Sequence, residues 1–287
     1  MLISIVAFAV NVLLLRALSD AIPAANAWVA TLFRGVIGWV VIVAAFRGRG
    51  FAPARLVASP LLLMRGMVGA AGILLFYITI ERMGAGRAVI INLTYPVFGA
   101  LMAALWLRER LNWGQVGWMG VGLVGLVVFL RSKTSQGGIS FDEGLALLGA
   151  IVAGAAVVLI RVLGRSEHAS TIYASQCLWS FVGGLPFGAK HLSGLPMEAW
   201  IILIVASVLV SVGQLALTHS FRTLSVAKGS SVQMLLPLAT GLGGYLFLGE
   251  RYSTTEIVGG LITLGATWQV VLHRGQPPRI ANRRFGP

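Results

Sequence analysis

The sequence predicts an all-α integral membrane protein with ten transmembrane helices, arranged as two inverted five-helix repeats. Composition is the first reason, because 57% of the 287 residues are hydrophobic and 11% are charged, whereas soluble domains carry about 25% charged residues. Periodicity is the second, because apolar runs of about 20 residues, each long enough to cross hydrocarbon as a helix, follow one another with short connections. Similarity between the two halves is the third.

The longest of these connections is the polar, Gly-containing stretch at 131–143. The first apolar run has no basic region before it, so we expect a retained helix and not a cleaved signal peptide. The stretch 274–287 is basic and contains prolines, and we expect a cytoplasmic tail. The predicted spans are 1–18, 25–46, 60–80, 85–107, 114–130, 143–163, 170–189, 198–220, 226–248 and 254–272.

Cationic residues predict the orientation of these spans. Of the 22 Lys and Arg residues, thirteen flank one side of the spans and seven flank the other, while Arg34 and Arg65 fall within spans. The side richer in cations faces the cytoplasm. We therefore expect both termini on the cytoplasmic side of a bacterial inner membrane, with the connection 131–143 on the outer side.

A shift of 141 residues places the second half of the chain on the first. It aligns Pro96 with Pro237, and the LRER of 107–110 with the LGER of 248–251. Each matching stretch is short, but both matches occur at the same shift of 141 residues. The chain therefore reads as an internal duplication.

The two repeats are expected at 1–131 and 143–273, with five spans in each. An odd number of spans forces the second repeat to insert in the opposite direction to the first. Inverted repeats are typical of secondary transporters, which bind substrate near the membrane midplane between the repeats.

These motifs resemble the drug/metabolite transporter superfamily, in its ten-helix EamA-type branch. The resemblance rests on Pro96 with 107–110, on Pro237 with 248–251, and on the Arg of LFRGVIG at 32–38 in the second span. It covers essentially the whole chain. It implies export of small metabolites or amino acids across the inner membrane, with no enzymatic activity.

Arg108 stands where that branch usually has Gly, a departure that concerns only the local turn. Glu109-Arg110 and Glu250-Arg251 would then end two helices at the membrane surface, since Gly stops a helix and the charges stay wet at headgroup level. Two interpretations remain open. The pair either pins a helix end at the interface or forms a latch that breaks in one state of the transport cycle.

Polar residues recur along one face of the eighth span. Ser207, Ser211, Gln214 and Thr218 are spaced by four, three and four residues, so they share a helix face. Amides and hydroxyls are costly against lipid, so this face should meet protein or water. Tyr77 lies at the counterpart of Thr218 in the third span. A substrate cavity and simple helix packing both fit this pattern.

Asn92 and Gln233 occupy equivalent positions, each four residues before a helix proline. Pro96 and Pro237 are expected to kink their helices and to free the carbonyls of those positions. An amide beside a freed carbonyl is a candidate substrate contact, with Tyr95 as a neighbouring stacking or hydrogen-bonding group. The alternative is that the amides repair the kinks locally.

Arg34 lies near the middle of the second span, where a charge is costly. Its partner is either a substrate carboxylate or Tyr hydroxyls and backbone carbonyls. Arg65 is nearer a helix end and is expected to snorkel to the interface. Asn11 in the first span is a further substrate-binding candidate.

The sequence gives little support to other functional classes. GVGLVG at 120–125 fits a dinucleotide fingerprint, but it falls inside a span, where helix packing explains the glycines. Cys177 is alone and no Cys/His cluster indicates a metal, so we expect neither metal nor cofactor. Nucleic-acid binding is not expected, because the basic residues are scattered between apolar runs. An intramembrane enzyme would need a buried acid or an activated nucleophile, which the sequence does not show.

Amino acids are the first guess for the substrate. Tyr77, Tyr95, Trp28 and Trp179 favour aromatic ones, as in the aromatic amino acid exporters of the branch. A nucleotide-sugar or sugar-phosphate carrier is the alternative, although it should show several cavity cations. The expected partners are a small-molecule substrate and the bilayer, with monomer and homodimer both left open.

All nine acidic residues fall in connections or at ends of the predicted spans, and so does His219. Proton-driven carriers usually hold a titrating group within the membrane. We therefore expect facilitated diffusion.

Overall fold

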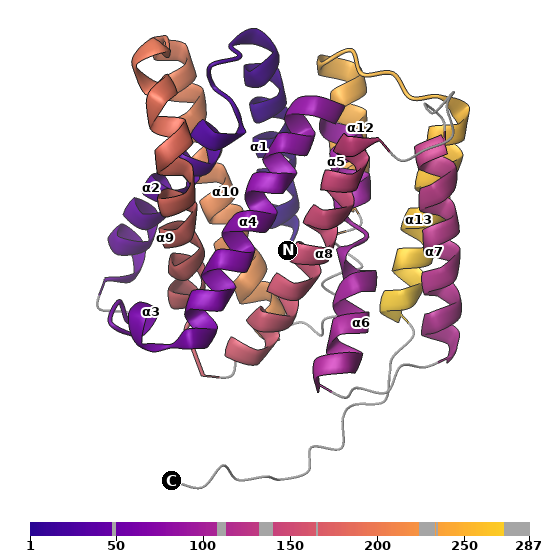
Figure 1. Cartoon of the computed structure of the whole chain (residues 1–287), viewed down its shortest axis with the longest axis horizontal. Coiled ribbons are helices and arrows are strands. Elements are labelled where there is room, and N and C mark those ends of the chain that lie inside the picture. Colours follow the sequence, from indigo (N-terminus) through magenta and orange to yellow (C-terminus); the bar gives the residue numbers. More distant parts are fainter. Residues whose placement is uncertain are drawn as a thin grey trace, which may run out of the picture.

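The computed structural model describes residues 1–47, 50–107, 113–131, 140–164, 166–223, 233 and 235–272. Within these ranges the chain forms a bundle of helices joined by short connections (Figure 1). Glu109 and Arg110, most of the 131–143 connection and the basic tail lie outside the described residues.

Six described segments are long and apolar enough to cross a membrane. The described helices begin and end within a few residues of the predicted spans, except at two spans. The span 85–107 is divided, and of the span 226–248 the structure describes residue 233 and then α12 from Leu235 onward. The helices are α1 (Leu2–Ala21), α2 (Ala27–Phe46), α3 (Arg55–Ala58), α4 (Pro60–Met83), α5 (Ala85–Asn92), α6 (Tyr95–Leu107), α7 (Trp113–Arg131), α8 (Phe141–Leu163), α9 (Ala169–Gly188), η1 (Ala189–Gly194), α10 (Met197–Thr223), α12 (Leu235–Phe247) and α13 (Thr254–Leu272).

Local hydrogen bonds fix where helices begin. The Asn26 side chain accepts hydrogen bonds from the N–H groups of Trp28 and Val29, at 3.1 and 3.2 Å, and so starts α2. At the start of α8, the Ser140 hydroxyl accepts from the Glu143 N–H, and the Glu143 carboxylate accepts from the Ser140 N–H at 2.8 Å. Such reciprocal capping satisfies N–H groups that have no partner within the helix.

The predicted span 85–107 is two helices and not one kinked helix. α5 ends at Asn92, and α6 begins at Tyr95 after a turn at Leu93 and Thr94. Thr94 holds this turn, because its hydroxyl donates to the Ile91 carbonyl at 2.7 Å. Pro96 consequently lies in the first turn of α6, where a missing N–H has no cost.

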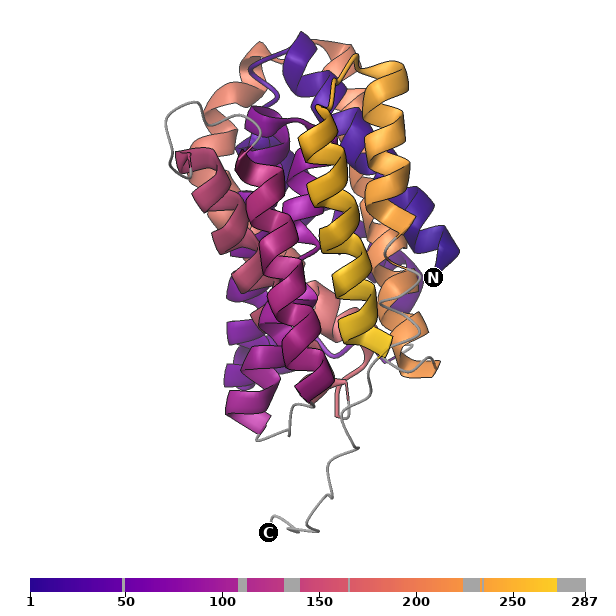
Figure 2. The same cartoon turned by 90° about the vertical axis from the view of Figure 1, so that its right-hand side faces the viewer.

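The two halves of the bundle are related by approximate two-fold symmetry. Equivalent helices pack against each other, α2 against α9 and α7 against α13. The contact of α4 with α8 has its counterpart in that of α10 with α1, and the contact of α6 with α8 in that of α12 with α1. Figure 1 shows α7 and α13 side by side at its right-hand edge, and in Figure 2, where that side faces the viewer, they lie side by side at the front. Each repeat is therefore interleaved with the other.

The second repeat runs in the opposite direction. Arg16, in the last turns of α1, donates to the Glu81 carbonyl near the end of α4. Arg82, also at the end of α4, pairs with Asp142 at the start of α8, at 2.9 Å. Thus α1 ends at the end of the bundle where its counterpart α8 begins. This end of the bundle is called the Glu81 end below.

Glycines allow the closest helix contacts. A Cβ added to Gly125 would lie 2.7 Å from the Thr263 nitrogen, so α7 and α13 cross there at backbone distance. A Cβ on Gly35 would lie 2.5 Å from the Phe181 nitrogen at the crossing of α2 and α9. Gly125 ends the GVGLVG stretch, so helix packing explains this glycine, as the sequence predicted.

Large apolar side chains cover the outside of the bundle. Leu105 is 79% exposed and Phe247 is 78% exposed, and many other Leu, Val and Ile side chains are exposed as well. A soluble protein rarely exposes so much contiguous apolar surface. This surface suits the hydrocarbon of a bilayer.

Candidate functional site

A cavity with about 970 Å³ of empty space, its opening included, lies among helices of both repeats. Its walls come from α1, α2, α4, α5 and α6 of the first repeat and from α8, α9, α10 and α12 of the second. Small and apolar residues of α4 and α8, among them Gly72 and Ala156, leave the space that larger side chains would fill.

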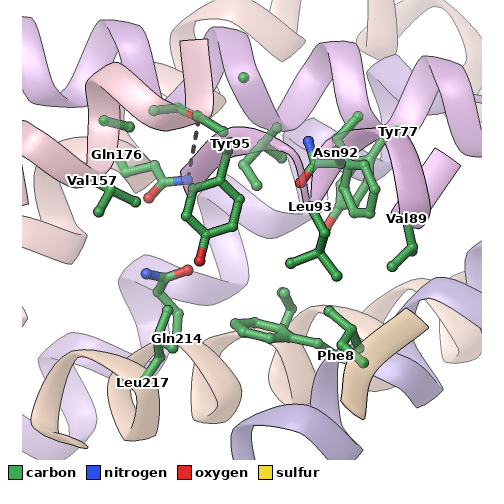
Figure 3. Close-up of a pocket in the computed structure, with 18 of the residues that line it drawn as sticks. Phe8, Tyr77, Val89, Asn92, Leu93, Tyr95, Val157, Gln176, Gln214 and Leu217 are labelled. Atoms are coloured by element: carbon green, nitrogen blue, oxygen red, sulfur yellow. Dashed lines mark hydrogen bonds between the residues drawn. The ribbon is translucent and has the colours of Figure 1, made fainter. Parts of the chain in front are cut away.

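Most of the polar residues singled out in the sequence meet in this cavity. They come from segments far apart in the chain, and Figure 3 shows Tyr77, Asn92, Tyr95 and Gln214 directed into the same space. The predicted substrate-binding residues that line the cavity are Asn11, Arg34, Tyr77, Asn92, Tyr95, Gln214 and Gln233.

Ser211 and Thr218 do not line the cavity, although they share a helix face with Gln214. The Ser211 hydroxyl is 2.9 Å from the Tyr173 hydroxyl of α9, and Thr218 donates to the Gln214 carbonyl at 2.8 Å. Both are buried in helix contacts. Of these three residues, only the longer Gln214 side chain reaches past the helix contacts into the open space.

Pro237, which the sequence assigned to a helix kink, is not among the described residues that line the cavity. Pro237 lies buried in α12.

Arg34 is buried in the cavity wall with neutral partners. Its guanidinium donates to the Tyr77 hydroxyl at 3.1 Å and to the Gln214 side-chain oxygen at 3.4 Å. Its Nε has no hydrogen-bond partner among the residues that the structure describes. Asn11, a lining residue from α1, donates to the Ala206 carbonyl of α10 at 2.9 Å.

The expectation that Arg65 snorkels to the interface is wrong. The residue is 2% exposed and lines the cavity, where it donates to the Gln176 side-chain oxygen at 3.0 Å. Snorkelling requires a side chain on the lipid-facing side of a helix end, and Arg65 lies on the inner face of α4. The sequence analysis also did not predict Gln176 as a site residue. An amide among the polar residues of the seventh predicted span could have indicated it.

The two equivalent amides differ in their surroundings. Gln233 is 4% exposed and donates to the Ser4 hydroxyl of α1 at 3.4 Å. Asn92 lies at the end of α5, half-buried, and its side chain makes no hydrogen bond within the described part of the chain. Asn92 therefore has unused donors and acceptors that face the cavity.

Charge is distributed unequally over the molecule. Ion pairs of Arg16, Arg82 and Arg87 gather at the Glu81 end of the bundle. None of the acidic residues that the structure describes lines the cavity, while Arg34 and Arg65 do. The described wall of the cavity is thus cationic.

Comparison with known proteins identifies the family that has this architecture. The model of the EamA-like transporter family matches residues 1–131 and 142–272, which together cover most of the chain. The chain belongs to the EamA-like transporter family. It is therefore a membrane transporter and not an enzyme.

Two characterised relatives of this EamA-like transporter align over most of both chains. The pseudopaline exporter CntI of Pseudomonas aeruginosa is 26% identical over 269 residues, 90% of each chain. The threonine/homoserine exporter RhtA of Salmonella typhimurium is 23% identical over 257 residues, 87% of this chain and 83% of that one. A solved crystal structure shares the fold, with a TM-score of 0.61, 17% identity, and coverage of 94% and 96% of the two chains.

At the Gly249-Glu250-Arg251 helix end of this EamA-like transporter, Arg251 is exposed, as expected at headgroup level, but Glu250 is not. Gly249 has a positive φ of 65° and ends α12, as predicted, but the Glu250 side chain is only 9% exposed. Its carboxylate accepts hydrogen bonds from the N–H groups of Ala85 and Gly86 and from the Tyr252 hydroxyl. Burial raises the pKa of Tyr252, and the hydrogen bond to Glu250 raises it further, so the phenol keeps its proton and donates.

Proposed function

We propose that this EamA-like transporter exports small metabolites, amino acids among them, across the bacterial cytoplasmic membrane by alternating access around the cavity. One observation carries the proposal: the cavity is lined by residues of both inverted repeats and by polar groups that have spare hydrogen-bonding capacity. A site shared by two repeats can be opened to either side when the repeats rock against each other.

The direction of transport and the substrate class rest on the relatives. The two relatives described above, CntI and RhtA, are exporters of small molecules by their names. Tyr77 and Tyr95 in the wall favour a ligand with aromatic or apolar parts. A carrier of sugar phosphates or nucleotide sugars is a second candidate, favoured by the second buried cavity cation, Arg65.

The test is transport by purified protein in liposomes loaded with labelled amino acids, sugar phosphates and nucleotide sugars. The variant Val157→Trp, which places a large ring at the cavity wall, should abolish efflux. The matched control is Leu148→Trp on the same helix, whose side chain is 46% exposed on the outer face and should tolerate the ring. Equal efflux from both variants would contradict passage through this cavity.

A further inference from the structure

We infer that Arg65 and Arg34, with Gln176, form an oxyanion subsite, and that the transported metabolites carry net negative charge through a carboxylate or phosphate group. The inference rests on the proposed transport function and names its substrate class. It narrows that class away from neutral and zwitterionic amino acids.

Unused hydrogen-bond donors are the first reason. Within the described part of the chain, Arg65 makes one side-chain hydrogen bond, through Nη2, while its Nε and Nη1 are buried without a partner there. The Nε of Arg34 is also buried without a partner. A buried donor left unsatisfied costs about 1–3 kcal/mol, and more when it is charged. Both guanidinium groups belong to residues that line the cavity, so a small turn of these side chains on binding would let an oxyanion supply the lone pairs that the three atoms lack.

Uncompensated charge is the second reason. The partners of the two guanidinium groups are neutral, namely Tyr77, Gln214 and Gln176. No acid among the described lining residues offsets the two positive charges. Charges held within a membrane normally pair with each other or mark a substrate pathway. A net anion neutralises this wall, whereas the ammonium group of a zwitterion would meet two cations and no described carboxylate.

Preorganisation is the third reason. Gln176 accepts from Arg65 and donates through its amide nitrogen to the Gly69 carbonyl at 3.3 Å. Gly69 also makes room for the guanidinium, because a Cβ at this position would collide with Nη1 of Arg65. The guanidinium group is therefore held in one place before a ligand arrives, which reduces the ordering needed on binding.

The decisive experiment compares four labelled probes in proteoliposomes: succinate, glucose 6-phosphate, phenylalanine and putrescine. We expect transport of at least one of the two anions, with a rate that responds to an imposed membrane potential because net charge moves. Arg65→Gln should raise the KM for that anion about ten- to a hundred-fold, from the loss of charge-assisted hydrogen bonds. Arg65→Lys should recover part of the affinity, because it keeps the charge. Arg55→Gln is the matched control, since Arg55 is 57% exposed and pairs with Glu167 away from the cavity.

Thermal melting separates a binding role from a structural one. Arg65→Gln removes an incompletely paired buried charge, so its Tm without ligand should equal or exceed that of the wild type. Succinate or glucose 6-phosphate should raise the Tm of the wild type and leave that of Arg65→Gln unchanged. A lower Tm for Arg65→Gln, with no stabilisation of the wild type by either anion, would overturn the subsite.

Two further outcomes distinguish this inference from the proposed function. Transport of phenylalanine in preference to both anions, unaffected by Arg65→Gln, refutes the oxyanion subsite and leaves an exporter of neutral metabolites. Absence of transport for every probe here and for the wider panel above contradicts the transport proposal itself. Preference for succinate over glucose 6-phosphate, or the reverse, identifies which oxyanion the subsite takes.

Discussion

Glu250 accepts a hydrogen bond from the backbone N–H of Ala85, the first residue of α5, although the two residues are 165 positions apart. A carboxylate of the second repeat thus caps a helix of the first repeat, where it also meets the positive end of the helix dipole. The Nε of Arg16 lies 3.9 Å from Oε1 of the same carboxylate. These contacts join the two repeats at the Glu81 end of the bundle.

Replacing Glu250 should loosen that end. Glu250→Gln keeps the shape but removes the charge, and it turns an N–H group toward donors that need an acceptor. We expect a loss of about 1–3 kcal/mol in the free energy of unfolding, measured by thermal or denaturant unfolding in detergent. Glu198→Gln is the control, because Glu198 is an exposed residue in the first turn of α10. An unchanged stability of Glu250→Gln would show that the cap adds nothing to the joining of the repeats.

Two glycines of α7 should differ in their sensitivity to substitution by alanine. Gly125→Ala forces a Cβ against the backbone of α13, and should cost about 1–3 kcal/mol by overpacking. Gly120→Ala meets nothing within 4 Å and should change the stability little. Unfolding midpoints of the two variants check the prediction. Similar midpoints would mean that α7 and α13 do not cross closely at Gly125.

Asn92→Leu should reduce transport while leaving the folded protein as stable as the wild type. Asn92 faces the cavity and makes no side-chain hydrogen bond within the described ranges, so the folded state loses none. If the amide instead repairs the break before α6, the variant will melt earlier and retain normal efflux per folded molecule. Gln233→Leu serves for comparison, because it loses the hydrogen bond to Ser4 and should lower both quantities.

Transport should require no proton gradient. Glu81 accepts from the Ala27 N–H at 3.0 Å at the start of α2, and His219 is exposed near the end of α10. Neither residue lines the cavity, and neither does any other described acid. An imposed pH gradient across proteoliposomes should therefore leave the final substrate distribution unchanged. Accumulation driven by the gradient, and lost in Glu81→Gln or His219→Gln, would refute facilitated diffusion.

The orientation in the membrane is open to a labelling test. The excess of Lys and Arg predicts both termini in the cytoplasm and the 131–143 connection outside. Gly137→Cys, made with Cys177→Ala, should react with an impermeant thiol reagent in intact cells. Cys177 is the one native cysteine of the sequence, so the introduced cysteine is the one thiol left to react. Reaction only after lysis would place this connection in the cytoplasm and reverse the whole bundle.

The sequence by itself determined that this chain lies in a membrane as helices, and it located most of them to within a few residues. The reason is that a bilayer offers the backbone no hydrogen bonds, so an apolar run of sufficient length must form a helix. The duplication was also readable, because Pro96 and Pro237 and the two Glu-Arg helix ends keep one spacing. Rare polar residues within apolar runs, such as Arg34 and Asn92, were likewise conspicuous.

The tertiary structure decided which face each helix turns to the cavity. A helix that is apolar on every side carries no hydrophobic stripe to fix its rotation, so the sequence did not show that Arg65 points inward or that Ser211 and Thr218 point into helix contacts. Long-range pairing was equally hidden. Nothing near Glu250 in the chain indicates that its carboxylate caps α5, because that contact exists only once the inverted repeats have interleaved and brought Ala85 beside it.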